Sequence, residues 1–344
     1  MSTTELTTLG LALDRFLQEE IAIPVTARSS ASTSQNYLRG VLRNKASADA
    51  EFPEILTKAD TDFLGGSFAR HTKIWPLDDI DLFIPLNGGD LIYMNNGYRL
   101  PYRIATESVT TRLTLPKWKV GELVSSVKVL EGFQAALQKT YPSSEVSADR
   151  HCVNLQTTVA ATSASDGIGF DVVPCFLLHP DDGSENFYLV PDGNGGWMRS
   201  NPRKDTEICA DLQDYHGGTY RKAVRLLKYW NKTQLDDQFQ SYYIELVVSK
   251  RFGQLKAEGK KVSYTTQAFD FAFGALAAAY VSGATRSLVV DAPDVPAPNL
   301  TAAQVAILKS DTANANIAFR QAYNDNSAET AFVTMNAIFS VDFF

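Results

Sequence analysis

The sequence is poor in the residues that build disulfide or zinc scaffolds. It holds three cysteines in 344 residues, Cys152, Cys175 and Cys209, and no two of them form a CxxC pair. An odd number of widely spaced cysteines in a chain of this size favours neither a disulfide framework nor a zinc ribbon. We therefore expect three free cysteines in a protein of the reducing cytoplasm.

Long apolar runs and an excess of positive charge are also absent. The longest apolar run, residues 269–280, contains Asp270 and is too short to cross about 30 Å of hydrocarbon. No basic stretch precedes an apolar core at the N-terminus, so we expect no secretory signal. Thirty-two Lys and Arg against 39 Asp and Glu give a formal charge of −7, which argues against a surface for a long nucleic-acid duplex or an anionic membrane.

The pattern of apolar residues divides the chain into an α/β unit and a helical unit, in line with a length that suggests about two domains. Apolar residues recur at helical spacing from Leu6 to Leu17, and the Ser/Thr-rich stretch 29–34 is expected to start a second helix near Gln35. Alternating polar and apolar residues predict two strands, with a helix between them. After Pro202 the texture becomes helical. These segments are strands at 79–84 and 169–174, and helices within 121–141 and near 218–232, 241–253, 266–282, 301–325 and 328–339.

A glycine-rich turn followed by alternate aspartates is the segment with the clearest chemical content. Gly65, Gly66 and Ser67 precede a predicted strand that carries Asp79 and Asp81. Residues two apart on a strand point to the same face, so these carboxylates can share hard cations through their oxygen atoms. Glycines let a backbone approach a polyphosphate closely, and a serine adds a hydroxyl donor. An isolated Asp-x-Asp pair is more often a capping or loop feature.

A third carboxylate extends this pattern to a candidate metal site. Asp171 lies on the second predicted strand, and it would stand beside Asp79 and Asp81 if the two strands are neighbours. Three carboxylates that converge repel one another and raise one another's pKa values unless cations are bound. Two Mg²⁺ ions about 3.5 to 4 Å apart remove this repulsion and support in-line phosphoryl or nucleotidyl transfer.

This set of residues resembles the polymerase-β-type nucleotidyltransferase superfamily, whose pattern is a Gly-Ser turn, a strand with Asp-x-Asp and a third Asp on a later strand. Within it, the sequence is similar to the bacterial CD-NTases, enzymes related to cyclic GMP-AMP synthase that act in anti-phage (CBASS) signalling. The likeness spans about residues 35–305. The further segments that carry it are 170–174, Trp197 with 200–202, 225–230, 241–246 and 291–301.

The resemblance implies an α+β fold with three parts. These are an N-terminal spine helix over residues 1–34, a polymerase-β-like nucleotidyltransferase core with a mixed sheet over 35–202, and a helical domain over 203–344. The helical domain is expected to be similar to that of oligoadenylate synthases and to close the nucleotide cleft. In this fold Asp79, Asp81 and Asp171 would be catalytic and would hold two Mg²⁺ or Mn²⁺ ions.

The resemblance also implies a set of nucleotide-binding residues. Gly66 and Ser67 would cradle the β and γ phosphates, Lys228 and Ser241 would contact the triphosphate, and Tyr242 would stack on the donor base. Spacing alone places Lys228 on one helix face with three other cations, Arg221, Arg225 and Lys232, which suits a polyphosphate or equally a solvated basic surface. Arg70 and Lys73 could contact an acceptor phosphate or lie on a loop surface.

The function that the resemblance implies is the joining of nucleoside triphosphates, ATP or GTP among them, into a cyclic di- or trinucleotide second messenger. Pyrophosphate is released, and a downstream effector in anti-phage defence reads the product. A linear oligoadenylate-type or RNA-tailing transferase stays open as an alternative, as does a non-catalytic nucleotide-binding regulator. Because His151 and Cys152 stand without a further Cys pair in the sequence, the zinc-binding insertion of animal cyclic GMP-AMP synthase is missing. We expect no double-stranded DNA activator and no membrane partner.

Overall fold

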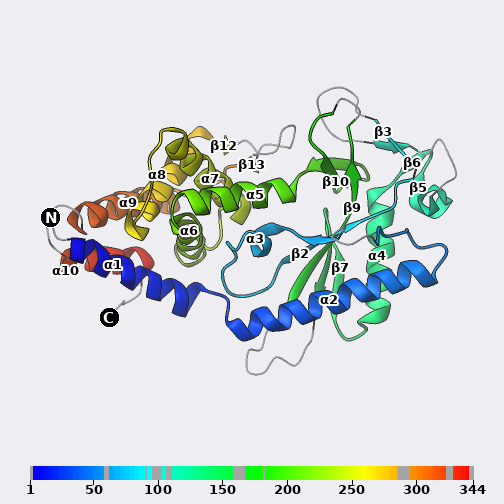
Figure 1. Cartoon of the computed structure of the whole chain (residues 1–344), viewed down its shortest axis with the longest axis horizontal. Coiled ribbons are helices and arrows are strands. Elements are labelled where there is room, and N and C mark those ends of the chain that lie inside the picture. The colour runs from blue at the N-terminus through cyan, green and yellow to red at the C-terminus, as the bar shows by residue number, and fades with distance from the viewer. Residues whose placement is uncertain are drawn as a thin grey trace.

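The chain folds into a lobe built around a mixed sheet and a lobe built of helices, which lie side by side in Figure 1. The computed structural model describes residues 3–57, 62–89, 91–94, 103–105, 111–157, 167–180, 183–285, 295–322 and 328–340. No helix in these ranges combines the length and the apolar character that a bilayer crossing requires. The expected division of the chain at residues 34 and 202 stays a prediction.

The sheet of the first lobe is mixed, as the expected α+β fold requires. Along it the strands run in the order β1, β2, β9, β10 and β11, while β8 pairs with the first half of β9 and β7 pairs with β8. The pair β2 and β9 is parallel and the other pairs are antiparallel. The strands are β1 (Phe63–Leu64), β2 (Ile80–Pro85), β7 (Glu145–Ala148), β8 (Val153–Gln156), β9 (Gly169–Leu178), β10 (Phe187–Pro191) and β11 (Trp197–Ser200).

The two faces of this sheet have different partners. One face buries Leu82 and Val172 in a large core shared with helix α4 (Ser126–Thr140), which begins at the Ser125 cap and ends before Pro142. Residues of β2 and β9 that alternate with these, Phe83 and Val173 among them, belong to a smaller cluster on the other face. Because side chains alternate along a strand, Asp81 and Asp171 point to this second face.

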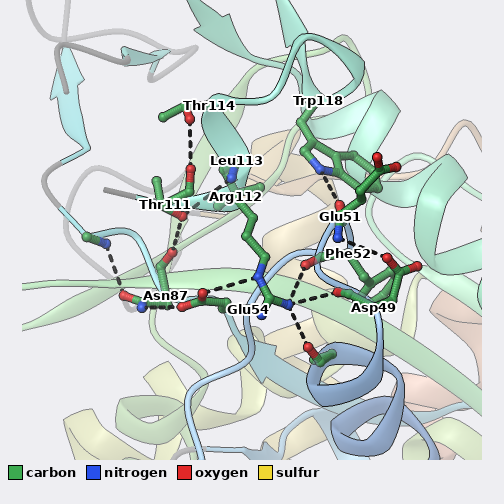
Figure 2. A network of polar contacts seen from close by, with 12 residues as sticks. Asp49, Glu51, Phe52, Glu54, Asn87, Thr111, Arg112, Leu113, Thr114 and Trp118 are labelled. Atoms are coloured by element: carbon green, nitrogen blue, oxygen red, sulfur yellow. Dashed lines mark hydrogen bonds and ion pairs between the residues drawn. The ribbon is translucent and has the colours of Figure 1, made fainter. Parts of the chain in front are cut away.

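A second sheet and two short 3₁₀ turns close the far end of the lobe. Its strands β3 (Ile92–Met94), β4 (Arg103–Ala105), β6 (Leu123–Val124) and β5 (Lys119–Val120) are antiparallel neighbours in that order. Figure 2 shows how the Arg112 guanidinium fastens this region: one of its nitrogens, Nη1, donates to the backbone oxygens of Ala46, Asp49 and Phe52 at 2.6, 2.9 and 3.3 Å. Arg112 thereby supplies donors to the backbone carbonyls at the C-terminal end of the helix that ends at Ala48 and to those just after it.

The helical lobe confirms the helices expected after residue 218 and adds one. The added helix is α5 (Pro202–Tyr215), which the Asn201 side chain caps by accepting from the backbone N–H of Lys204 at 3.2 Å. Phe269 and Phe273 of α8 are fully buried core residues. The other elements are α6 (Thr219–Leu235), α7 (Ser241–Ala257), α8 (Thr265–Ser282), β12 (Ala284–Thr285), β13 (Val295–Pro296), α9 (Ala302–Arg320) and α10 (Ala328–Phe339).

Two N-terminal helices run along the two lobes. Helix α1 (Thr3–Phe16) and a π turn (Leu17–Ile21) pack on α6, α8 and α10, while α2 (Val25–Ala48) extends along the sheet lobe, where it packs on α4 (Figure 1). The expectation that the second helix starts near Gln35 was wrong. Its first residue is Val25, because Pro24 ends the preceding segment and stands at the N-cap, so the Ser/Thr-rich stretch 29–34 lies inside the helix.

Candidate active site

The parallel register of β2 and β9 brings two of the predicted carboxylates together. Asp81 on β2 stands opposite Asp171 on β9, and Asn154 on β8 stands opposite Asp171 from the other side. The Nδ2 of Asn154 donates to Oδ1 of Asp171 at 2.6 Å, which orients that carboxylate. The sheet therefore presents a row of oxygen ligands across three adjacent strands.

Asp79, the third predicted carboxylate, comes directly before β2 and has a different neighbour. It forms an ion pair with the ammonium of Lys73, which also binds Asp78. Within the part of the chain that the structure describes, no three His, Cys, Asp or Glu side chains are grouped, as they stand, to hold a metal ion. The lysine thus provides the positive charge beside Asp79 in this conformation.

Burial raises the pKa values of the three carboxylates, and their mutual repulsion adds to the effect. Burial, followed by the charges of Asp171 and Asp79, raises the pKa of Asp81 to about 7. Burial also raises the pKa of Asp171, although the hydrogen bond from Asn154 opposes it, and the pKa of Asp79, although Lys73 opposes it. The cluster is therefore short of positive charge.

The glycine turn is fitted closely against this cluster. The N–H of Gly65 donates to the backbone oxygen of Asp81 at 3.0 Å, and Gly66 adopts a φ of +61°. A Cβ at Gly66 would lie 1.6 Å from Oδ2 of Asp81, so only glycine leaves room for the carboxylate there. Ser67 follows at the start of the short helix α3 (Gly66–Ala69) and is buried. Clustered carboxylate oxygens, whose mutual repulsion a divalent cation would relieve, lie against this glycine turn, so the residues fit Mg²⁺.

A cavity of about 440 Å³ opens between the lobes beside Asp79. It brings together three of the predicted site residues, Asp79 from the sheet lobe and Lys228 and Ser241 from the helical lobe. Asp171 lines a neighbouring cavity of about 230 Å³ with Asn154, and Asp78 lines both. The larger cavity is lined by Lys73, Ile74, Trp75, Pro76, Asp78, Asp79, Lys228, Lys232, Asp237, Phe239, Gln240 and Ser241.

Lys228 is buried and has a carboxylate partner that the sequence analysis did not assign. Its Nζ donates to Oε1 of Glu245 at 2.5 Å, and Oε2 of Glu245 accepts from Nε of Arg70 at 2.5 Å. Burial alone would raise the pKa of Glu245, but Arg70 and Lys228 hold it at about 2. Arg70 is therefore neither a loop-surface residue nor an exposed phosphate contact, because its guanidinium is buried in this ion pair.

The remaining predicted residues are placed around this pair. Tyr242, expected to stack on a base, donates its hydroxyl to Oδ2 of Asp205 at 3.0 Å, and the Arg70 guanidinium lies 5.6 Å from the centre of its ring. Of the basic helix face, Lys232 lines the cavity with Lys228, whereas Arg225 donates from Nε to the backbone oxygen of Arg221 at 3.4 Å.

Asn154 and Glu245 are the functional candidates that sequence reasoning missed. The signal for Glu245 was the lysine itself, because Lys228 is flanked on α6 by the buried residues Leu227 and Trp230, and a buried ammonium needs an anion. For Asn154 the signal was the alternation of polar with apolar residues on β8, which puts it on the same face as the aspartates.

Comparison with known proteins finds one relative by sequence and, by structure, solved proteins of the same fold. No protein-family model matches the chain. A probable cyclic nucleotide synthase of Bacillus cereus strain VD146 is 27% identical over 248 residues, which make up 71% of each chain.

The solved structures that resemble the chain extend over almost its whole length. Escherichia coli MS115-1 CdnC with ATP has a TM-score of 0.59 at 17% identity and matches 97% of this chain and 98% of that one. The CdnC:HORMA-deltaN complex gives 0.61 at 16% identity, with 96% of each chain matched. These structures confirm the expected α+β fold.

Proposed function

We propose that the chain is a nucleotidyltransferase of the CD-NTase type that joins nucleoside triphosphates into a cyclic di- or trinucleotide and releases pyrophosphate, a proposal that its likeness to a probable cyclic nucleotide synthase and to CdnC supports. The observation that carries the proposal is the β2 and β9 register, which puts Asp81 opposite Asp171. Asp171 lines a cavity that shares Asp78 with the cavity between the lobes. Nucleotidyl transfer needs a clustered set of carboxylates on one side of a triphosphate and cations on the other. Asp79 and Lys228 line that cavity from the two lobes.

We assign two divalent cations, Mg²⁺ or Mn²⁺, to Asp79, Asp81 and Asp171. When bound, these ions would neutralise charge on the reacting phosphate and favour the deprotonated acceptor hydroxyl. The chain's own part is to orient the ligands: Asn154 holds the Asp171 carboxylate, and Gly66 leaves the space that the Asp81 carboxylate fills. For Asp79 to serve as a ligand, Lys73 would move away from it.

The phosphate-binding residues divide between the lobes. Gly66 and Ser67 would bind the β and γ phosphates from the sheet lobe, and Lys228 and Ser241 would bind the triphosphate from the helical lobe. Lys228 has three donors, and its bond to Glu245 uses one, which leaves donors for phosphate oxygens. Tyr242 would stack on the donor base, for which its ring would exchange the Arg70 contact for a nucleobase.

The partners that we propose are nucleotides and proteins. CdnC has been solved with ATP, which supports ATP as one substrate here, and in complex with HORMA-deltaN, which supports a protein partner. We propose a cytoplasmic enzyme of anti-phage defence whose product activates a downstream effector, with no requirement for double-stranded DNA.

The test is synthesis by the purified chain. The protein is incubated with Mg²⁺ or Mn²⁺ and four α-³²P-labelled nucleoside triphosphates, treated with phosphatase and analysed by chromatography. A phosphatase-resistant product is expected, and omission of each nucleotide in turn identifies its bases. Product that phosphatase degrades would instead assign linear transfer, and nucleotide binding without pyrophosphate release would assign a regulator.

Matched variants tie any product to the site. The double variant Asp79→Asn/Asp81→Asn should make none, whereas Asp211→Asn, which removes a surface partner of Lys256, should make as much as the unmodified chain. Retained synthesis by the double variant would refute the assignment of these carboxylates.

A further inference from the structure

Glu245 sits between cations that come from the two lobes. Its two carboxylate oxygens are used separately: Oε1 accepts from Lys228 of α6 and Oε2 accepts from Arg70, each at 2.5 Å. Glu245 and Lys228 are 3% exposed and Arg70 is 7% exposed. Glu245 is thus a buried bridge between helix α7 and the segment that follows α3.

Arg70 is attached firmly to the glycine turn. Its backbone N–H donates to the oxygen of Gly66 at 3.2 Å, and its backbone oxygen accepts from the thiol of Cys209 on α5 at 3.4 Å. The Arg70 backbone is therefore held close to the turn, and its buried guanidinium is held at Oε2 of Glu245. Through Glu245 this constraint extends to the ammonium of Lys228.

The three charges depend on one another because they are removed from water. Each buried charge would cost several kcal/mol without a partner, and Glu245 is the anion that both cations bind. The trio carries one net positive charge, and Lys228 is the member of it that lines the cavity between the lobes. Asp81 and Asp205 also act on Arg70, and Asp79 acts on Lys228. Other charged residues around that cavity are Lys73, Asp78, Asp79, Lys232 and Asp237.

On the basis of the proposed function, we propose that Glu245 is a positioning residue for triphosphate binding. It sets the separation between the phosphate-binding turn of the sheet lobe, with Gly66 and Ser67, and the ammonium of Lys228 in the helical lobe. Because the two halves of the site are already aligned before the triphosphate binds, binding does not include the free-energy cost of ordering them. A merely structural ion pair would stabilise the fold and leave nucleotide affinity unchanged.

The experiment measures the affinity of the full chain for α,β-methylene-ATP with Mg²⁺, an analogue whose α–β linkage cannot be cleaved. Glu245→Gln should weaken binding about tenfold, with KM for the triphosphate raised and kcat less affected. Arg70→Lys keeps the charge but loses the Nε donor, and should weaken binding in the same direction to a smaller extent. Asp14→Asn is the matched control, because it removes the partner of Lys222 on the same helix α6 and should leave affinity unchanged.

A double-variant cycle separates bridging from two independent effects. If Glu245 acts between Arg70 and Lys228, the affinity loss in Glu245→Gln/Arg70→Lys should be smaller than the sum of the two single losses. Additive losses, or unchanged affinity in a folded Glu245→Gln variant, would overturn the proposal. Because binding of the analogue is measured without turnover, a chain that binds it but makes no product contradicts the proposed function alone.

Discussion

The two sides of the cleft carry charge in opposite ways. On the sheet side, Asp79, Asp81 and Asp171 lie close enough to interact, and the pKa of each is raised, that of Asp81 to about 7. On the helical side, Glu245 is bound by two cations and its pKa is held at about 2. The aspartates of the sheet side would be stabilised by added positive charge, whereas the carboxylate of the helical side is already paired with cations of the protein itself.

This difference separates a carboxylate cluster that gains stability from bound cations from a paired carboxylate that fixes the positions of its neighbours. Carboxylates that repel one another destabilise the empty protein and gain most from cations, because bound charge removes the repulsion. A carboxylate that is already paired gains nothing from a cation and instead fixes its partners. Variants on the sheet side should therefore lose catalysis without losing stability, whereas breaking the Glu245 pair on the helical side should lower both stability and triphosphate affinity.

The largest expected effect is on the sheet side. Asp81→Asn should lower the rate of nucleotide incorporation by at least about 1,000-fold, because transition-state charge stabilisation is lost. Its free energy of unfolding at pH 7.5 without divalent cations should be equal to or above that of the unmodified chain, because the substitution removes a repelled charge. Incorporation assays and urea unfolding measure the two quantities. A variant that stays active, or one that unfolds much more easily, would contradict this account.

On the helical side, Glu245→Gln should cost stability. The ordinary pKa of 4.5 falls to about 2 in the fold, so ionised Glu245 stabilises the protein above about pH 4.5, and this contribution is lost as the pH falls toward 2. Breaking the pair should lower the free energy of unfolding at pH 7 by about 3 kcal/mol. The difference in free energy of unfolding between the unmodified chain and Glu245→Gln should become smaller as the pH falls from 6 to 3. An equal difference in free energy of unfolding at both pH values would show that the charge of Glu245 does not cause the loss of stability. Glu258→Gln, at an exposed ion pair, serves as control.

The sheet side should show the opposite pH trend. A carboxyl whose pKa is raised binds more protons folded than unfolded, so without cations its contribution to stability declines as the pH rises from about 4 to about 7. Mg²⁺ at about 100 times its Kd should restore about 2.7 kcal/mol at pH 7.5. Thermal unfolding with Mg²⁺ and with EDTA measures this, and the shift in Tm should vanish in Asp81→Asn. A shift of the same size in that variant would place the Mg²⁺ elsewhere.

The comparison also explains what the sequence could predict. Local alternation was enough to predict the strands that carry Asp81 and Asp171. That the two strands are neighbours was only a condition of the sequence analysis, and the parallel register of β2 and β9 meets it. The bridge at Glu245 joins residues 175 positions apart, and no periodicity reports a contact of that separation. The start of α2 was missed because hydroxyl side chains suggested a cap at residues 29–34, whereas Pro24 marked the boundary.

The smallest expected change in stability concerns the space that the glycine turn leaves for a carboxylate. Gly66 and Gly217 have φ values of +61° and +63°, so replacement of either by alanine should cost about 1 kcal/mol of backbone strain. The surroundings differ: a Cβ at Gly66 would meet Oδ2 of Asp81 at 1.6 Å, and a Cβ at Gly217 would meet nothing within 4 Å. Because a carboxylate can rotate away, Gly66→Ala should displace Asp81 and lose most incorporation activity with little further loss of stability. Gly217→Ala should lose stability alone, and equal activity in the two variants would mean that the Asp81 carboxylate does not need its place against the turn.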